Sequence, residues 1–243
     1  MKEKKLFFAA IRYSIPVLLG YPAIGFAFGL LMADAGYPWW LALLMSTVMY
    51  AGAGQFIAIG IFAAGASLWE AALVQLVVNA RHMAYGLSMI KRMPFTGFSK
   101  VYCIFGMTDE TFALLSSLPA DENEEMIHVP GLKEPVPAGS RSKFMFLITL
   151  LNQIYWVSGS LIGVFTGSLI PFNIEGISFA LTALFIVLML EQVFRIRKSG
   201  IFIISAIAAV LAVLLLPHRI SLLAAISAAL AVSLIFHKKK SIQ

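Results

Sequence analysis

The feature that constrains this chain most is a succession of long apolar runs, each separated from the next by a short polar or basic stretch. A helix needs about 20 mostly apolar residues to cross a bilayer. Apolar residues make up 60% of the 243-residue chain and charged residues only 12%, and a soluble fold of this size could not bury so much apolar surface. The chain is therefore predicted to be an integral membrane protein.

The predicted fold class is all-α, a polytopic transmembrane helical bundle of seven or eight spans in which some helices are broken. The count of seven stays open because the second or the third span would not cross the membrane if it were re-entrant. The eight candidate spans cover approximately residues 8–31, 39–63, 68–90, 98–118, 143–169, 175–194, 200–217 and 219–236.

One long polar stretch, residues 119–142, divides the predicted spans into two groups of four. It carries five acidic residues and four prolines, which is typical of a surface loop with little regular structure. The sequence thus predicts a first half, 1–118, that carries the polar motifs. The acidic loop follows, and a second half, 143–243, ends in a basic tail.

The distribution of lysine and arginine predicts the orientation in the membrane. With eight spans and both termini in the cytoplasm, 13 of the 18 basic residues fall on the cytoplasmic side and 4 on the other, with one inside a span. Basic residues near span ends favour the cytoplasmic side. Both termini are therefore predicted to be cytoplasmic, and the protein is predicted to be a multi-pass protein of an inner membrane.

The second span contains the small residues Gly52 and Gly54, followed by the polar Gln55, near its centre. Small residues at this depth either allow close helix packing or break the helix. A break frees backbone N–H groups, and the N-terminal end of a half-helix attracts a carboxylate. Gly25 and Gly29 of the first span, spaced as G-x-x-x-G, are interpreted as packing residues.

The fourth span is predicted to be interrupted by a new helix start. Thr108 is a favourable N-cap residue, and Asp109 and Glu110 suit the first turn that follows it. The alternative is that the two acids lie near an interface and contact water. An acid at mid-span costs about 2.5–3.5 kcal/mol on insertion scales, so the sequence favours a functional role for this pair.

The third span contains several polar side chains at membrane depth. An arginine there needs a carboxylate or carbonyl partner, and Asp109 and Glu110 are the candidates for Arg81. His82 titrates near neutral pH, so proton transfer and a plain hydrogen-bonding role both stay open. The polar residues of this span are Gln75, Asn79, Arg81, His82 and Tyr85.

Four further polar residues are interpreted as structural. Ser67 and Glu70 have the spacing of a capping box at the start of the third span. Asn152 and Gln153 lie at membrane depth in the fifth span, where bridging between helices is favoured over substrate binding.

The sequence lacks the motifs of the common enzyme classes, including a Walker A loop, a dinucleotide-binding glycine motif, H-E-x-x-H and G-x-S-x-G. It also has one cysteine, Cys103, and no cluster of metal-ligating residues. The chain is therefore predicted to be no enzyme, to hold no metal or cofactor and to bind no nucleic acid. Two rivals to a coupled transporter are an uncoupled channel or facilitator and a membrane-embedded enzyme or assembly factor.

Three motifs in order give the chain a resemblance to a known family. Residues 51–56 (AGAGQF), 79–85 (NARHMAY) and 105–112 (FGMTDETF) resemble the AzlC or YgaZ type, the large subunits of bacterial branched-chain amino acid exporters. The resemblance implies export of leucine, isoleucine and valine, and often methionine, driven by the proton motive force. It also implies a small membrane partner of the AzlD or YgaH type, and it marks Gly52, Gly54, Gln55, Asn79, Arg81, His82, Tyr85, Asp109 and Glu110 as signature residues.

A zwitterionic amino acid needs a partner for its carboxylate, a partner for its ammonium group and an apolar pocket. The N–H groups around Gly52–Gln55, or Arg81, are candidates for the first, and Asp109 or Glu110 for the second. The carboxylate of one of these acids is also expected to take up the coupling proton, with His82 as a further candidate. The residues expected to form the apolar pocket are Phe56, Tyr85, Met107 and Phe112.

Overall fold

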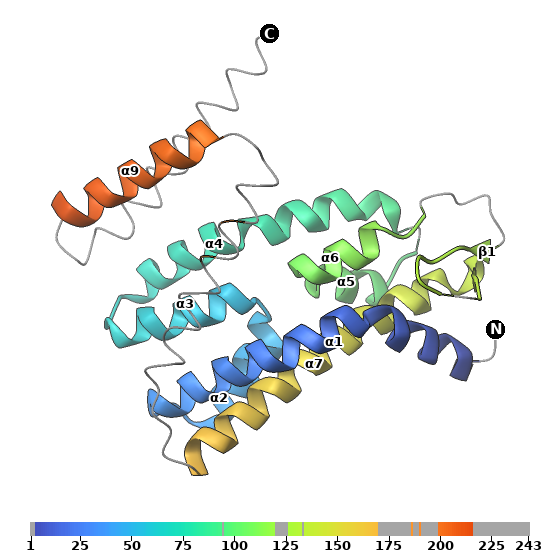
Figure 1. Ribbon diagram of the computed structural model, residues 1–243, viewed down its shortest axis with the longest axis horizontal. Coiled ribbons are helices and arrows are strands. Elements are labelled where there is room, and N and C mark those ends of the chain that lie inside the picture. The colour runs from blue at the N-terminus through green and yellow to red at the C-terminus, as the bar shows by residue number, and fades with distance from the viewer. Residues whose placement is uncertain are drawn as a thin grey trace, which may run out of the picture. The chain divides into compact units, whose positions relative to one another are not determined.

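The computed structural model describes residues 3–93, 95–119, 126–132, 134–169, 186, 190 and 199–215. Over these residues the structure is almost entirely helical (Figure 1), which confirms the all-α class. Two strands of two residues each pair antiparallel within the predicted loop, β1 (Met126–Ile127) and β2 (Val136–Pro137). The helices are α1 (Glu3–Asp34), α2 (Trp39–Leu44), η1 (Met45–Met49), α3 (Gly52–Ala63), α4 (Leu68–Met89), η2 (Ile90–Arg92), α5 (Phe98–Phe105), α6 (Asp109–Ser116), η3 (Ala138–Ser140), α7 (Arg141–Leu169) and α9 (Ser199–Leu215).

The predicted spans correspond to helices wherever the chain is described. The first span is one continuous helix, α1, although Pro16 and Pro22 lie inside it. The second span is split into α2, η1 and α3, and the fourth into α5 and α6, so both predicted breaks are present. The predicted spans 175–194 and 219–236 lie almost wholly outside the described residues, and the total count stays a prediction.

The chain divides into two compact units. The first contains residues 1–59 and 79–177, and therefore holds α1, α2, the start of α3, the second half of α4, and α5 to α7. The second contains residues 60–78 and 178–243, with the end of α3, the first half of α4, and α9. All residues discussed below as a site belong to the first unit.

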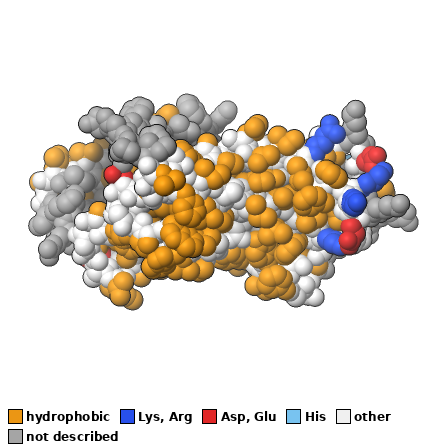
Figure 2. Space-filling model, turned by 90° about the horizontal axis from the view of Figure 1, so that it is seen from below, with side chains coloured by type: hydrophobic (Ala, Val, Ile, Leu, Met, Phe, Trp, Pro, Cys, Tyr) orange, Lys and Arg blue, Asp and Glu red, His pale blue; other side chains and the backbone are white. Residues whose placement is uncertain are grey.

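The surface of the described residues is unusually apolar for a water-exposed protein. Leu19 is 76% exposed and Leu169 is 82% exposed, and many other large hydrophobic side chains face outward. Figure 2 shows hydrophobic side chains spread over one face, with lysine, arginine and acidic side chains gathered at one end of it. Large exposed apolar surfaces indicate contact with a membrane or another protein.

Two helices among the described residues are long and apolar enough to cross a membrane, Glu3–Asp34 and Ala138–Leu169. The two pieces of the second span, Trp39–Met49 and Gly52–Ala63, are apolar, but each contains fewer than 18 residues. Neither piece is therefore long enough to count as a membrane-crossing helix by itself. The count of apolar helices therefore reflects the breaks as much as the number of crossings.

The two long helices, α1 and α7, pack side by side and run parallel (Figure 1). Gly25 lies against Trp156 and Ser160, and Gly29 against Ser160 and Val164, so positions later in α1 meet positions later in α7. If both helices cross the bilayer, a parallel pair requires an odd number of crossings between them. The three spans predicted between residues 39 and 118 satisfy that condition.

Glycine is required where α1 and α7 meet. A Cβ atom on Gly29 would lie 2.1 Å from the Ser160 carbonyl oxygen, and one on Gly163 would lie 2.1 Å from the Phe26 carbonyl oxygen. Backbone atoms cannot move away as a flexible side chain can. This confirms the interpretation of Gly25 and Gly29 as packing residues.

Gly29→Ala is expected to destabilise the protein by about 1–3 kcal/mol or more, because the added methyl group overpacks the α1–α7 contact. The melting temperature of the detergent-solubilised protein measures the effect. Gly20→Ala is the matched control, since a Cβ atom on Gly20 meets nothing within 4 Å. Equal melting temperatures for the two variants would contradict this packing.

Candidate functional site

The first helix break lies between η1 and α3 and is built on a strained residue. Helix α2 continues into the five-residue π-helix η1, and Tyr50 then adopts a left-handed conformation with φ 39° and ψ 49°. Tyr50 is the one non-glycine residue with positive φ among the residues that the structure describes. Such a conformation costs on the order of 1–3 kcal/mol and persists only where the surroundings impose it. Helix α3 begins two residues later, at Gly52.

The second break lies between α5 and α6. The α5 helix ends at Phe105, and the Thr108 hydroxyl caps α6 by accepting a hydrogen bond from the Thr111 N–H. A Cβ atom on Gly106 would lie 2.3 Å from Thr149 Cγ2, so the close approach of α7 requires glycine here. The prediction that Thr108 caps a new helix is confirmed.

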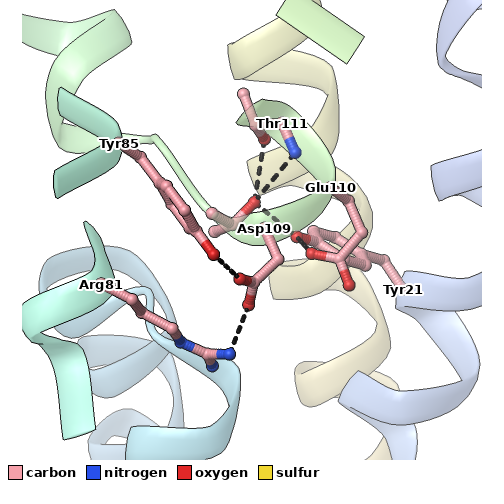
Figure 3. A network of polar contacts seen from close by, with 7 residues as sticks. Tyr21, Arg81, Tyr85, Asp109, Glu110 and Thr111 are labelled. Carbon is pink, nitrogen blue, oxygen red and sulfur yellow. Dashed lines mark hydrogen bonds and ion pairs between the residues drawn. The ribbon is translucent and has the colours of Figure 1, made fainter. Parts of the chain in front are cut away.

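Asp109 is held by two groups from α4. Its Oδ2 atom pairs with Arg81 Nη1 at 2.9 Å, and its Oδ1 atom accepts a hydrogen bond from the Tyr85 hydroxyl at 2.7 Å (Figure 3). The Tyr85 ring in turn stacks on Phe112 with 4.5 Å between ring centroids. The predicted pairing of Arg81 with one of the two acids is confirmed, and the acid is Asp109.

Glu110 is held differently, by a neutral hydroxyl from α1. The Tyr21 hydroxyl lies 2.6 Å from Glu110 Oε2 and also 2.6 Å from Thr108 Oγ1 (Figure 3). Within the described part of the chain Glu110 forms no ion pair of 4.0 Å or less. The two adjacent acids therefore differ, because a cation balances Asp109 and none is paired with Glu110.

Gln55 belongs to a separate buried network behind the first break. Its Oε1 atom accepts from the Trp156 indole N–H at 2.9 Å, and its Nε2 atom donates to Ser46 Oγ at 3.1 Å. Ser46 continues the network to Ser160 of α7 at 3.0 Å. The Gln55 side chain is fully buried, and both ends of its amide are engaged, so it joins the break to α7 in this conformation.

The two networks meet at aromatic rings. The Tyr21 ring packs edge-on against Trp156 with 5.4 Å between centroids, and a Cβ atom on Gly52 would lie 3.1 Å from the Trp156 ring. Trp156 therefore separates the start of α3 from the tyrosine that holds Glu110.

The other predicted site residues lie around this core. Gly54 is buried in the first turn of α3, and Asn79 lies two residues before Arg81 on α4. The His82 ring lies 6.2 Å from the Tyr85 ring, centroid to centroid. The structure thus brings Arg81, Tyr85, Asp109 and Glu110 to one place.

The four residues interpreted as structural form hydrogen bonds that stabilise helices or connect them. Glu70 accepts from the Ser67 N–H at 2.8 Å and donates its own N–H to Ser67 Oγ, which confirms the capping box. Asn152 donates to Thr111 Oγ1 and Gln153 donates to the Thr47 carbonyl, so both bridge helices as predicted.

Four residues of the site were missed by sequence reasoning: Tyr21, Tyr50, Thr111 and Trp156. Tyr21, Tyr50 and Trp156 lie in apolar runs and are ordinary membrane-helix residues by type, whereas Thr111 directly follows Asp109 and Glu110. The available signal was the amphipathic character of tyrosine and tryptophan far from a span end, since a buried hydroxyl or indole N–H needs a partner.

Comparison with known proteins places the chain among membrane proteins. The sequence profile of the family described as AzlC protein matches residues 16–170. The "Branched-chain amino acid transport protein AzlC" of Bacillus subtilis strain 168 is 35% identical over 204 residues, which is 82% of this chain and 74% of the relative. The "Inner membrane protein YgaZ" of Escherichia coli K12 is 30% identical over 212 residues, or 85% and 80% of the two chains.

A membrane protein of Helicobacter pylori strain J99 is 42% identical over 188 residues, covering 77% of this chain and 76% of the relative. No solved structure matches the chain. The relatives are membrane proteins, in agreement with the apolar surface of the described helices.

Proposed function

The chain belongs to the AzlC protein family, and from that membership we propose that it is the large subunit of an exporter of branched-chain amino acids driven by the proton motive force. The substrates are leucine, isoleucine and valine, with methionine as a further one. The Bacillus subtilis relative, named a branched-chain amino acid transport protein, supports the substrate class.

The proposed mechanism rests on the different partners of two adjacent acids, Asp109 and Glu110. Asp109 is bound by Arg81 and Tyr85, whereas Glu110 contacts only the Tyr21 hydroxyl among these groups. A carboxylate without a cationic partner at membrane depth is costly. It gains most from binding either a proton or an ammonium group. Glu110 therefore exchanges the coupling proton for the substrate's ammonium group, and Asp109 holds Arg81 in place.

The substrate carboxylate then needs another partner, because Arg81 is already paired. The start of α3 supplies one, since the first N–H groups of a helix lack partners within the helix and carry partial positive charge. Gly52 lies at this start, and no acidic residue occurs between it and Ala63. The apolar side chain of the substrate lies among Phe56, Met107 and Phe112.

The protein works in the bacterial inner membrane, with both termini in the cytoplasm and a small membrane partner of the AzlD or YgaH type. The parallel packing of α1 and α7 supports the placement of the N-terminus, because it puts the basic starts of both helices on one side. Lys5 pairs with Glu134, and Lys143 contacts Glu3, at those starts.

Deletion of this gene is expected to raise intracellular leucine, isoleucine, valine and methionine in cells fed branched-chain dipeptides. Quantification of the free amino acids in wild-type, deletion and complemented strains checks this. Restoration should require this gene together with its small partner. Unchanged amino acid levels in the deletion strain would refute the proposed substrate class.

A further inference from the structure

We propose that Tyr21, Thr108, Thr111 and Asn152 form a hydrogen-bonded chain whose direction follows the protonation of Glu110, and that this chain reports the protonation to Tyr50 at the other helix break. The inference rests on the proposed role of Glu110 as the group that takes up the proton. It adds Tyr21, Thr111, Asn152 and Tyr50 as positioning residues.

The chain is continuous from Glu110 to α7. The Tyr21 hydroxyl lies 2.6 Å from Glu110 Oε2 and 2.6 Å from Thr108 Oγ1. Thr108 Oγ1 lies 2.9 Å from Thr111 Oγ1, which lies 3.0 Å from Asn152 Nδ2. Thr111 and Asn152 are fully buried, so water does not substitute for these contacts in this conformation.

When Glu110 is ionised, donor counting fixes the direction of the chain. A carboxylate only accepts, so Tyr21 donates to Glu110. Thr108 then donates to Tyr21, Thr111 donates to Thr108, and Thr111 accepts from the Asn152 amide. In this state the Thr108 and Thr111 hydroxyls point opposite to their direction in the structure, where Tyr21 donates to Thr108 and Thr108 donates to Thr111. Each hydroxyl gives its one proton and receives at least one, so every link is satisfied.

When Glu110 is protonated, the order reverses. Glu110 donates to Tyr21, Tyr21 to Thr108 and Thr108 to Thr111, so the Thr111 hydroxyl needs a new acceptor. One proton has been added, at the Glu110 carboxylate, and the hydroxyl protons have only changed direction. Without an acceptor for the Thr111 hydroxyl, the protonated state of Glu110 would be disfavoured, because an unpaired buried hydroxyl costs about 1–3 kcal/mol.

Two buried atoms are in place to accept that proton. Asn152 Oδ1 and the Tyr50 hydroxyl have no hydrogen-bond partner among the described residues. Asn152 is fully buried and Tyr50 is 3% exposed. The Tyr50 hydroxyl lies beside Thr111 and Thr108 without meeting hydrogen-bond geometry to either. A turn of the Asn152 amide, or a small shift of Tyr50, completes the reversed chain, and such unpaired groups are otherwise rare in folded proteins.

The titratable and charged groups around Glu110 are few within the described part of the chain. Asp109 precedes Glu110 on α6, Arg81 approaches from α4, Tyr21 comes from α1, and Tyr50 comes from the first break. They include His82, which follows Arg81 on α4 and interacts electrostatically with Arg81 and Asp109. Asn152 of α7 is neutral, and Tyr102 of α5 interacts electrostatically with Tyr50. Arg81 is tied to Asp109, so the hydroxyl chain is the hydrogen-bonded link from Glu110 toward Tyr50, whose hydroxyl the charge of Glu110 also reaches through space.

Tyr50 is suited to receive this signal because its backbone is strained. It lies in the left-handed region immediately before the first turn of α3, where the substrate carboxylate is proposed to bind. A hydrogen bond gained or lost at the Tyr50 hydroxyl therefore changes the interactions that stabilise the strained turn. Proton uptake at Glu110 is thereby linked to the opposite end of the proposed substrate site.

Infrared difference spectroscopy of the vesicle-reconstituted protein between high and low pH tests the chain without measuring transport. The bands of the Glu110 carboxyl and of Tyr50 are identified by their loss in Glu110→Gln and Tyr50→Phe. In the wild type both bands are expected to change together, with one midpoint. In Thr111→Val the Glu110 band still titrates, while the Tyr50 band no longer changes. Thr111→Ser, which keeps the hydroxyl, restores the response.

Tyr21→Phe breaks the chain at its other end and is the second variant, because the ring is kept and only the hydroxyl is lost. Tyr13→Phe is the matched control, since Tyr13 also joins α1 to α6 but bonds Leu114 and Ser117. A Tyr50 band that ignores pH in the wild type, or that still responds in Thr111→Val and Tyr21→Phe, would overturn the inference. Failed export with an intact Tyr50 response would refute the proposed function alone.

Discussion

Glu110→Gln is expected to reduce leucine export to background while the protein still inserts and folds. Glutamine keeps the shape of the side chain and an oxygen that accepts from Tyr21, which lies 2.6 Å from Glu110. It cannot hold a negative charge, so it neither takes up a coupling proton nor forms an ion pair with an ammonium group. Efflux of labelled leucine from preloaded cells measures the effect, with membrane abundance measured in parallel.

Glu134→Gln is the matched control for this substitution. Glu134 is 69% exposed and pairs with Lys5 outside the site, and exposed ion pairs contribute little to stability. Its variant should export at the wild-type rate. Wild-type export by Glu110→Gln at equal abundance would show that the substrate and the proton bind elsewhere.

The second large effect concerns the Arg81–Asp109 pair, whose single and double substitutions are expected to be strongly non-additive. Arg81→Met and Asp109→Asn each leave one charged partner unmatched, with side chains only 28% and 31% exposed. An unmatched charge away from water is destabilising, whereas removing both charges leaves none to satisfy. The double variant is therefore expected to recover about 1–3 kcal/mol relative to the sum of the single losses.

Melting temperatures of the four proteins measure this coupling. Tyr85→Phe serves as a further comparison, since it removes the second hydrogen bond to Asp109 without changing any charge. Strictly additive losses would mean that the pair contributes no net interaction. Export should stay impaired in the stabilised double variant, because Asp109 then no longer orders the site beside Glu110.

Features set by neighbouring residues were predictable from the sequence. The Thr108 cap and the Ser67–Glu70 capping box each depend on residues three positions apart, and both are present. The breaks at Gly52 and Gly106 follow from small residues beside polar ones in apolar runs. The Arg81 pairing was predictable because a membrane arginine must be neutralised and two acids were available.

Features set by distant residues were not predictable. From the sequence alone, Asp109 and Glu110 were equivalent candidates for binding the ammonium group and the proton. They differ because Glu110, and not Asp109, accepts from the Tyr21 hydroxyl, which lies 89 residues before Glu110 in the chain. The partner of the Gln55 side chain could not be read from the sequence either, because its amide oxygen accepts from the Trp156 indole, 101 residues away.

The most direct test of the central claim is leucine efflux against a concentration gradient from cells carrying this protein and its small partner, with and without a protonophore. The account predicts uphill efflux in the wild type that collapses when the protonophore is added, and none in Glu110→Gln under either condition. Efflux that proceeds only down the gradient and is insensitive to the protonophore would contradict coupling and indicate an uncoupled facilitator.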